Sequence, residues 1–397
     1  MIVQTDRIVK GDRVTVTEGQ AVCIRGGRIA AIGTPEELKE RFPEEAVAVF
    51  EGCTLMPGMT DMHVHLGFCT AHGDYYDKQN RESLQALFAA DRMRKTLEQG
   101  VTTVRDACSG FGIGTALKRA AADGYLKAPR IFTCLQGICM TGGHGADALP
   151  GACIEADGVE ECRKAVRLNL KNGADCIKAL SSEGYRGAEL NLEELTAIAE
   201  ETHRFGKKAA LHAGYGESME NGILAGFDSI EHGTNLTVEQ ARRMAEKDIT
   251  WVPTVLVFNY VYEEGKKQIG NLLSLSEKPA VMQYLEEATE AYRTNLRALY
   301  DTGVRVCTGT DTDCTTYTGA SPVALECEYL VRCGLTPLEA VECATKNCAD
   351  YLGMGDRLGQ IAEGYIADVI VVAGDPSRDI GALKNVKAVY QAGERVC

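Results

Sequence analysis

Two histidines lie one residue apart near the start of the chain. The stretch "DMHVHLGFCTAHG" begins at Asp61 and places His63 and His65 at alternate positions. Alternate residues of a strand point to the same face, so both imidazole rings would emerge side by side. Paired neutral imidazoles are common metal ligands, which makes a metal site the functional hypothesis. The structural alternative is a pair of half-buried polar residues at the end of a strand.

Four more polar side chains follow apolar runs at the same kind of position. They are Lys178 in "DCIKAL", His212 in "AALHAG", His232 in "SIEHG" and Asp311 in "CTGTD". If these runs are parallel strands of a barrel, their carboxyl ends meet at one rim, where the side chains would converge. Any one of them alone is more often structural. Together with the two histidines above, their shared strand-end position is hard to explain by chance and predicts a metal centre.

Lys178 is the unusual member of this set. Ile177 and Ala179 flank it on a predicted strand, so its amine would lose hydration, which favours the neutral form. A neutral amine can add carbon dioxide to form a carbamate, an oxygen donor able to bridge two cations, whereas an ammonium would repel both. The structural alternatives are a lysine paired with a neighbouring carboxylate and a lysine that reaches out of the mouth into solvent.

The elements that would position these residues alternate between strands and helices. Apolar runs begin near residues 55, 101, 130, 174, 207, 227, 249 and 304, and helical stretches such as "NLEELTAIAEETHRFG" lie between them. Eight β units alternating with helices are typical of an α/β fold of the (β/α)8 TIM-barrel type. A doubly wound sheet is the rival fold, but no GxGxxG follows the first strand.

Both ends of the chain are predicted to be β-rich. "AVCIRGGRIAAIG" is typical of a hairpin with a Gly-Gly turn, and "GQIAEGYIADVIVVAG" follows near the other end. We therefore expect one small β-sandwich domain built from residues 1–57 and 358–397, and a barrel over residues 58–357. An extra helical stretch, residues 258–300, is predicted to cover the barrel mouth or a subunit contact, or to be an insertion without a role.

Composition narrows the classes of partner and location. The formal charge is −14 and no basic run is present, which argues against a nucleic-acid partner. No stretch approaches the ~18 apolar residues of a membrane span, and the first residues alternate polar and apolar types, unlike a secretory leader. The sixteen cysteines include no CxxC pair, and we expect reduced thiols in a cytoplasmic protein, with disulfides as the alternative. The sequence leaves a homo-oligomer open.

The ordered set of motifs resembles a known family. "DMHVH", "IKAL", "LHAG", "SIEHG" and "TGTD" look like the metal-ligand motifs of the amidohydrolase superfamily, in its binuclear branch with a carboxylated lysine. "GVTTVRDA", "TGGHG" and "GQIAEGYIADVIVV" are similar to its imidazolonepropionase-like members and to Xaa-Pro and Xaa-Arg dipeptidases, over nearly the whole chain. The resemblance implies two divalent metal ions, one held by His63, His65 and Asp311, the other by His212 and His232, with carboxylated Lys178 and a hydroxide between them. Zinc suits imidazole and oxygen ligands best.

The resemblance also implies a reaction, the hydrolysis of an amide-type C–N bond by the bridging hydroxide. Asp311 would take the proton of the hydroxide and pass it to the leaving nitrogen. His144 in "TGGHG" would bind the carbonyl oxygen or a carboxylate of the substrate. Tyr215 in "HAGYG" would polarise the carbonyl, although the dipeptidases carry this tyrosine nearer the histidine. The expected substrates are small molecules, dipeptides or N-acyl amino acids, cleaved as by a prolidase or carboxypeptidase.

Three further residues have weaker claims. His72, in the loop after the first barrel strand, could line the pocket, and Arg186 in "SSEGYRG" could hold a substrate carboxylate. That loop departs from the "ASGG"-like loop of the dipeptidases, so proline or arginine specificity is not carried over. His203, within the helical "EETHRFG", is expected at the surface.

Two alternative functions remain open. A mononuclear deaminase or cyclic-imine hydrolase of the imidazolonepropionase type would not use Lys178 as a ligand. A non-catalytic scaffold on the same barrel would be expected to have lost a ligand, yet none of the six positions is missing.

Overall fold

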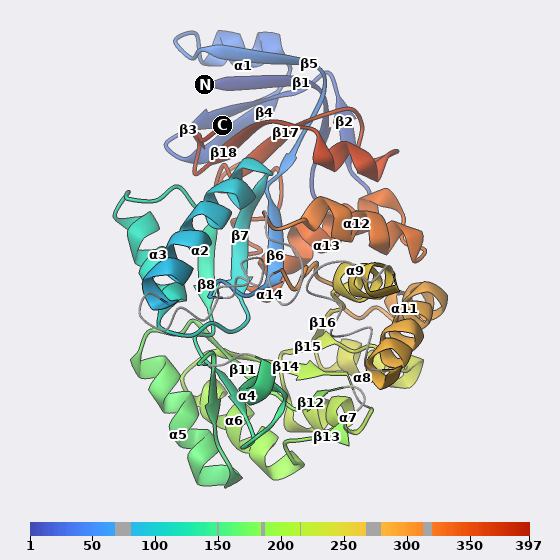
Figure 1. Ribbon diagram of the computed structural model, residues 1–397. Helices are drawn as coiled ribbons and strands as arrows, with labels where there is room; N and C mark the ends of the chain where they lie inside the picture. Colours follow the sequence, from blue (N-terminus) through green and yellow to red (C-terminus); the bar gives the residue numbers. More distant parts are fainter. Residues whose placement is uncertain (68–80, 149–150, 184–186, 215, 267–278, 313–319) are drawn as a thin grey trace.

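The computed structural model describes residues 1–397 except 68–80, 149–150, 184–186, 215, 267–278 and 313–319. Figure 1 shows two parts: a sheet that contains both chain termini, and below it strands surrounded by helices. The predicted ligands all belong to the lower part.

Parallel strands form the inner wall of the lower part. They are β6 (Met59–Val64), β7 (Val101–Asp106), β8 (Arg130–Thr133), β9 (Gly137–Cys139), β11 (Cys176–Leu180), β14 (Lys208–Ala213), β15 (Ser229–His232) and β16 (Thr250–Val252). β8 pairs with β7, and β9 pairs with β11, so β8 and β9 are two pieces of the third barrel strand. They are separated around Leu135, whose φ is 56°. Residues of β6, β7 and β11 are buried throughout, as expected for strands enclosed by helices.

Residues 304–312 complete the barrel. On one side the Cys307 amide donates to Trp251 O, at 3.0 Å, and on the other side the Asp311 amide donates to His63 O, at 2.8 Å. These bonds join the last strand to the first and close the ring. The predicted (β/α)8 barrel is therefore confirmed.

Helices cover the outside of the barrel. They are α2 (Arg81–Glu98), α3 (Ile113–Ala122), α5 (Gly158–Lys171), α6 (Leu192–Arg204), α7 (Gly216–Ala225), α8 (Val238–Glu246), α12 (Val323–Arg332), α13 (Pro337–Ala344) and α14 (Lys346–Tyr351). Short elements in the loops are α4 (His144–Ala148), β10 (Cys153–Glu155), β12 (Ser182–Glu183) and β13 (Gly187–Ala188). Capping boxes begin α6, α8 and α13 and supply acceptors for their first backbone N–H groups. Among the described helices, none combines the length and the apolar character that a membrane span requires.

Both termini contribute strands to the upper sheet. The strands are β1 (Ile2–Val9), β2 (Val16–Glu18), β3 (Ala21–Arg25), β4 (Arg28–Gly33), β5 (Val47–Pro57), β17 (Val369–Ala373), β18 (Val386–Gln391) and β19 (Glu394–Arg395), in the order β19-β18-β17-β5-β1-β3-β4 with β2 beside β1. Residues on one face, such as Val3, Leu55 and Val371, form a hydrophobic cluster within the sheet domain. The other face is covered by α1 (Pro35–Arg41) at one end and packs against the barrel at the other, near η2 (Ile380–Lys384).

The hairpin predicted in the first part of this sheet is confirmed. β3 and β4 pair antiparallel and turn at Gly26 and Gly27, whose φ values of 54° and 76° suit a type I′ turn. The strands of the sheet lie near the two chain ends, as expected. The domain limits proposed above, 1–57 with 358–397 and 58–357, stay a prediction.

An ion pair lies inside the barrel. The guanidinium of Arg105, on β7, donates to Glu231 Oε2 at 2.6 Å, and both side chains are fully buried. Arg105 also donates to Met62 O, and Ser229 Oγ donates to the second oxygen of Glu231, each at 2.6 Å. Burial opposes the charge on Glu231, but Arg105 and Lys178 outweigh it and lower the pKa of Glu231. The buried charges of Arg105 and Glu231 therefore stabilise each other.

The substitution Glu231→Gln should destabilise the metal-free protein by about 3–5 kcal/mol, because it leaves the buried guanidinium of Arg105 without a counter-charge. Denaturant unfolding followed by circular dichroism measures this loss. The matched control is Glu98→Gln, which breaks an ion pair with Arg94 whose side chains are 45% and 46% exposed. The control should cost less than about 1 kcal/mol. Equal losses in the two variants would contradict the importance of the buried pair.

Two helices, α9 (Val255–Lys266) and α11 (Pro279–Tyr300), occupy the stretch predicted as an insertion and pack against each other (Figure 1). The buried carboxylate of Glu326, on α12, accepts the backbone N–H groups of Val255 and Leu256, at 3.0 and 2.7 Å. These bonds satisfy two of the donors left open at the start of α9. Burial nevertheless raises the pKa of Glu326 to about 8.

The substitution Glu326→Gln should change how stability depends on pH. The folded chain holds the proton of Glu326 more tightly than the unfolded chain, where the pKa is near 4.5. This contribution to stability is fully present below pH 4.5 and is lost as the pH rises to about 8, by up to about 1.4 kcal/mol per pH unit. Urea titrations across this range should show the wild type losing stability relative to Glu326→Gln as the pH rises. Parallel pH profiles of the two proteins would argue against the raised pKa.

Candidate metal centre

Five of the six predicted ligands lie near or just after the carboxyl ends of barrel segments, and Lys178 lies in the middle of β11. β6 carries His63 and precedes His65, and β11, β14, β15 and the eighth segment carry Lys178, His212, His232 and Asp311 respectively. Ligating atoms of His63, His232 and Asp311 lie within 4.8 Å of one another, and all three residues are buried. The structure thus brings together residues from opposite sides of the barrel.

The other members lie beside these three. His65 Nε2 is 3.0 Å from Asp311 Oδ1. The ring centroids of His63 and His232 are 5.0 Å apart, and those of His212 and His232 are 4.5 Å apart. Four imidazoles and one carboxylate therefore share one small space at the mouth of the barrel.

Three of the histidine rings are held through their Nδ1 atoms. The contacts are His63 Nδ1 with Glu231 Oε2 at 2.8 Å, His65 Nδ1 with Cys108 O at 2.9 Å, and His232 Nδ1 with Thr254 Oγ1 at 2.7 Å. The Glu231 carboxylate and Cys108 O can only accept, so they favour the tautomer with Nδ1 protonated and the lone pair on Nε2, and the Thr254 hydroxyl can accept in the same way. Metal-ligating histidines are usually oriented in this way.

Burial keeps most of these imidazoles neutral. It lowers the pKa of His63, His212 and His232 well below the ordinary value of 6.5, and neighbouring positive charge lowers it further. Burial would also lower the pKa of His65, but its contact with Asp311 raises it. For Asp311 burial would raise the pKa, yet His63 and His65 lower it to about 2. Three imidazoles held neutral and an ionised carboxylate are donors that suit a divalent cation.

The amine of Lys178 is a buried polar group of this space that lacks a hydrogen bond within the described residues. The side chain is 1% exposed, and Nζ has no hydrogen-bond partner within the described residues. Burial lowers the pKa of Lys178, which favours the neutral amine. A buried polar group without a partner is costly unless something binds it. The residues present therefore fit a divalent metal centre.

Backbone strain marks the same place. His232, Thr254 and Asp311 have φ values of 65°, 52° and 52°. Left-handed backbone is uncommon for residues with a Cβ, and most of all for a β-branched residue such as Thr254. Such strain persists where the surrounding structure enforces it, which is typical of functional sites.

His144, one of the two predicted substrate residues, lies at this mouth. Its ring centroid is 4.8 Å from that of His212, and its side chain is half-buried. Its backbone N–H donates to both carboxylate oxygens of Glu189, at 3.0 Å each, which fixes the start of α4. The position of His144 is compatible with contact to a substrate held beside His212.

The remaining candidates divide into two groups. Tyr215, His72 and Arg186 lie outside the described residues, so their predicted roles stay predictions. His203 is confirmed at the surface: its side chain is 42% exposed and its Nε2 lies 2.8 Å from Asp228 Oδ2.

Sequence reasoning missed the residues that orient the ligands. Glu231 and Asp61 stand inside the quoted motifs "SIEHG" and "DMHVH", but their partners are far away in the chain. The Asp61 carboxylate accepts hydrogen bonds from Thr310 Oγ1, at 2.6 Å, and from Thr310 N, at 3.0 Å. These bonds connect β6 to the segment that carries Asp311. The only signal available was that each of these two acidic residues stands within two residues of a predicted ligand.

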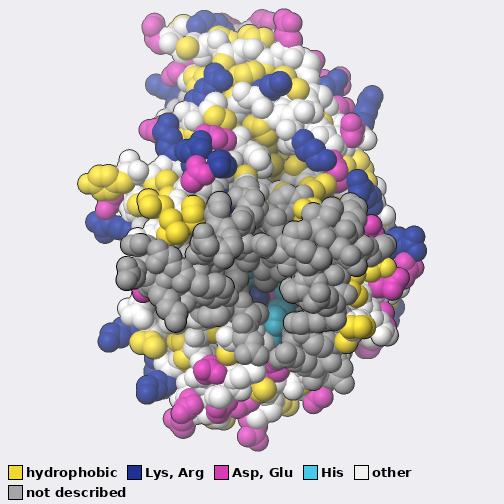
Figure 2. Space-filling model, viewed as in Figure 1, with side chains coloured by type: hydrophobic (Ala, Val, Ile, Leu, Met, Phe, Trp, Pro, Cys, Tyr) yellow, Lys and Arg dark blue, Asp and Glu magenta, His cyan; other side chains and the backbone are white. Residues whose placement is uncertain are grey.

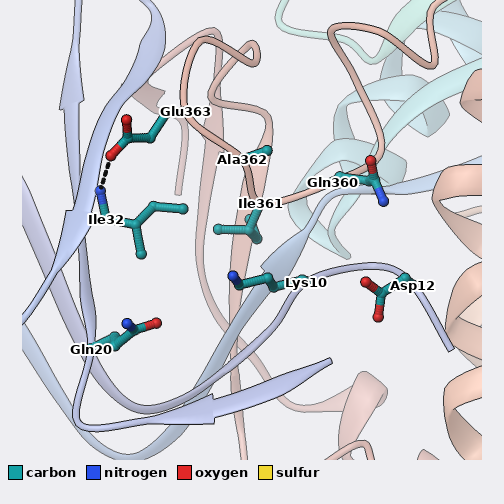
Figure 3. A pocket seen from close by; sticks show the side chains of 8 residues that line it. All are labelled: Lys10, Asp12, Gln20, Ile32, Gln360, Ile361, Ala362 and Glu363. Atoms are coloured by element: carbon teal, nitrogen blue, oxygen red, sulfur yellow. Dashed lines mark hydrogen bonds between the residues drawn. The ribbon is translucent and has the colours of Figure 1, made fainter. Parts of the chain in front are cut away.

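Figure 2 shows histidine side chains at the bottom of an opening in one face of the molecule. A separate cavity of about 400 Å³ lies in the upper part, beside β4 (Figure 3). Lys10, Asp12 and Glu363 bring charges of both signs to its wall, and the Glu363 carboxylate accepts Ile32 N at 3.1 Å. The described residues that line this cavity include no histidine or cysteine. Of the two places, only the barrel mouth therefore has histidines that could bind a metal.

Comparisons with known proteins agree with this site. Residues 54–396 match the Amidohydrolase family, and residues 21–44 match an imidazolonepropionase-like composite domain of bacteria. Ochratoxinase of Aspergillus niger is 30% identical over 425 residues, covering 98% of this chain and 84% of that protein. The crystal structure of this ochratoxinase has a TM-score of 0.85, at 27% identity, and covers 99% of this chain and 94% of that one.

Two other relatives also resemble this chain over most of its length. The crystal structure of a Xaa-Pro dipeptidase with bound methionine in the active site has a TM-score of 0.86, at 27% identity, over 99% of this chain and 98% of that one. Imidazolonepropionase of Pyrobaculum arsenaticum is 26% identical over 381 residues, 91% of this chain and 87% of that protein. The family predicted from the motifs is confirmed. This chain belongs to the amidohydrolase family, in its imidazolonepropionase-like group, and is a hydrolytic enzyme.

Proposed function

We propose that this hydrolase uses two divalent metal ions to cleave the amide bond of a dipeptide or an N-acyl amino acid. One observation carries the proposal. One space at the ends of the strands contains histidines whose Nδ1 atoms are already engaged, an ionised Asp311 and the Lys178 amine, which has no partner among the described residues. This combination has the donors for metal ions and the base for a proton transfer.

Each predicted ligand has a role in this proposal. His63, His65 and Asp311 would hold one ion, His212 and His232 the other, and Lys178, carboxylated by carbon dioxide, would lie between the ions. Burial lowers the pKa of Lys178, which supports carboxylation, because only the neutral amine reacts with carbon dioxide. When bound, the ions (zinc is our first choice) supply a water acidic enough to attack at neutral pH and a positive charge beside the substrate carbonyl.

The chain's own residues would move the proton and hold the substrate. Asp311 is ionised, so it can accept a proton from the attacking water and pass it to the leaving nitrogen, which then departs as an amine. His144, beside His212, would donate a hydrogen bond to the carbonyl oxygen or to a carboxylate of the substrate. Tyr215 is proposed as a further donor to the carbonyl oxygen.

Several observations support the proposed substrate class and setting. The methionine bound by the Xaa-Pro dipeptidase supports a substrate with an amino-acid part. The net charge of −14 supports a small-molecule partner rather than a nucleic acid. The fourteen described cysteines carry free thiols, which supports a cytoplasmic location. A homo-oligomer is compatible with all of these points.

A library of dipeptides and N-acyl amino acids, with release of free amine as the readout, tests the function of the zinc-loaded enzyme. Asp311→Asn should lower kcat on any substrate found by about 10²–10⁴-fold, because the proton acceptor is lost. The matched control is Asp301→Asn, at a side chain that is 56% exposed beyond α11, and it should keep wild-type activity. Two metals bound without turnover of any amide in the library would overturn the proposal.

The imidazolonepropionase relatives favour a second candidate, a mononuclear deaminase or cyclic-imine hydrolase. The metal content of Lys178→Ala separates the two candidates. A binuclear enzyme should bind about two ions per chain and lose at least one in this variant, because the bridge is gone. Lys171→Ala, at an exposed lysine of α5, is the control and should bind as many ions as the wild type. One ion per chain in both the wild type and Lys178→Ala, measured by elemental analysis after dialysis, would favour the mononuclear candidate.

A further inference from the structure

His232 differs from the other site histidines in what surrounds it. His63 and His65 are oriented by Glu231 and by Cys108 O, which belong to barrel strands or follow them directly. His232 ends β15 in left-handed backbone, and its carbonyl oxygen accepts two donors, Trp251 Nε1 at 2.7 Å and the hydroxyl of Tyr292 at 3.0 Å. Tyr292 lies on α11, within the insertion.

The ring of His232 also touches the insertion. Its Nδ1 lies 2.7 Å from Thr254 Oγ1, directly before α9, and the ring of Phe258, on α9, meets it edge-on with centroids 5.6 Å apart. Thr254 is fully buried. When Nε2 of His232 is the ligand, Nδ1 carries the proton, so the threonine hydroxyl is the acceptor that sets the rotation of the ring.

Thr254 is fixed from both sides. Pro253 O, before it, accepts the same Tyr292 hydroxyl at 2.8 Å. Val255 N, after it, donates to the buried carboxylate of Glu326 at 3.0 Å. Thr254 has a φ of 52°, which a β-branched residue adopts only under restraint, and these two contacts supply that restraint.

We propose that Thr254, Tyr292 and Glu326 are positioning residues for His232, so that the helices inserted after β16 set the affinity of the metal position that His232 serves. The inference rests on the proposed function, because it assumes that His232 ligates a metal. It assigns a role to the insertion, which was predicted to cover the barrel mouth, to form a subunit contact or to have no role. Burial raises the pKa of Glu326 to about 8, so keeping this carboxyl group buried costs stability. A helix contact that only filled space would not require this cost.

The physical reason is geometric. An imidazole binds a metal through one lone pair in the plane of its ring, so a rotation of the ring moves that lone pair off the ion. Loss of the partner that orients a ligating histidine typically lowers metal affinity by about 10–100-fold. The effect should be confined to one of the two ions, because His63 and His65 have other partners.

The test compares metal binding rather than activity. Thr254→Val removes the hydroxyl and keeps the β-branched shape, whereas Thr254→Ser keeps the hydroxyl. Equilibrium dialysis against zinc buffered by a chelator, with elemental analysis, gives the affinity of each position. We expect Thr254→Val to weaken one position by about 10–100-fold and leave the other unchanged, and Thr254→Ser to bind like the wild type.

Tyr292→Phe is a second variant that serves even where Thr254→Val fails to fold. It deletes one hydroxyl from α11 and should weaken the same position. Tyr300→Phe, at the far end of α11, where the hydroxyl lies 3.4 Å from Glu342, is the matched control and should change neither position. Thermal melting of the metal-free variants separates a loss of stability from a loss of affinity.

The outcomes distinguish this inference from the proposed function. Wild-type affinity at both positions in Thr254→Val and Tyr292→Phe would overturn the inference and leave the proposed function standing. Equal weakening of both positions would also overturn it, because the effect would then not pass through His232. A wild-type chain that binds no metal would overturn the proposed function itself, and the inference with it.

Discussion

Loss of water at the mouth of the barrel is the constraint on which the rest of the site depends. Burial keeps His63 and His232 neutral and lowers the pKa of Lys178, whose amine finds no hydrogen-bond partner within the described residues. Apolar side chains in the same space would give a more stable protein. A cation bound at the mouth would satisfy these buried polar groups. Because it would bind only the folded chain, it would also stabilise the fold.

Glu231 couples this space to the interior of the barrel. Its Oε2 atom lies 2.6 Å from Arg105 Nη2 and 2.8 Å from His63 Nδ1, so one oxygen serves a guanidinium and an imidazole. If a cation binds Nε2, as proposed, it would withdraw electrons from the ring and make Nδ1–H a stronger donor to this oxygen. Arg105 in turn keeps Glu231 ionised, so the barrel core maintains the negative charge that faces His63 Nδ1.

The sequence predicted the barrel and the meeting of its polar strand ends, because both follow from local patterns: apolar runs with a period and a polar residue where each run stops. Other features depend on contacts through space. The break of the third strand at Leu135 and the reduction of the eighth strand to isolated bridges at Val306 and Thr312 leave no mark on the apolar runs. Asp61 and Glu231 stood inside the motifs, yet their roles depend on partners 249 and 126 residues away.

The insertion shows why such contacts matter for function. A loop that merely covered a mouth could change in length and sequence without affecting the chemistry beneath it. Here Thr254, Phe258 and Tyr292 all contact His232, so the segment that follows β16 also supports this ring. Under the proposed function, the arrangement of α9 and α11 is therefore linked to the metal position that His232 would serve. A change that reshapes α9 or α11 would also shift His232, unless the three contacts are kept.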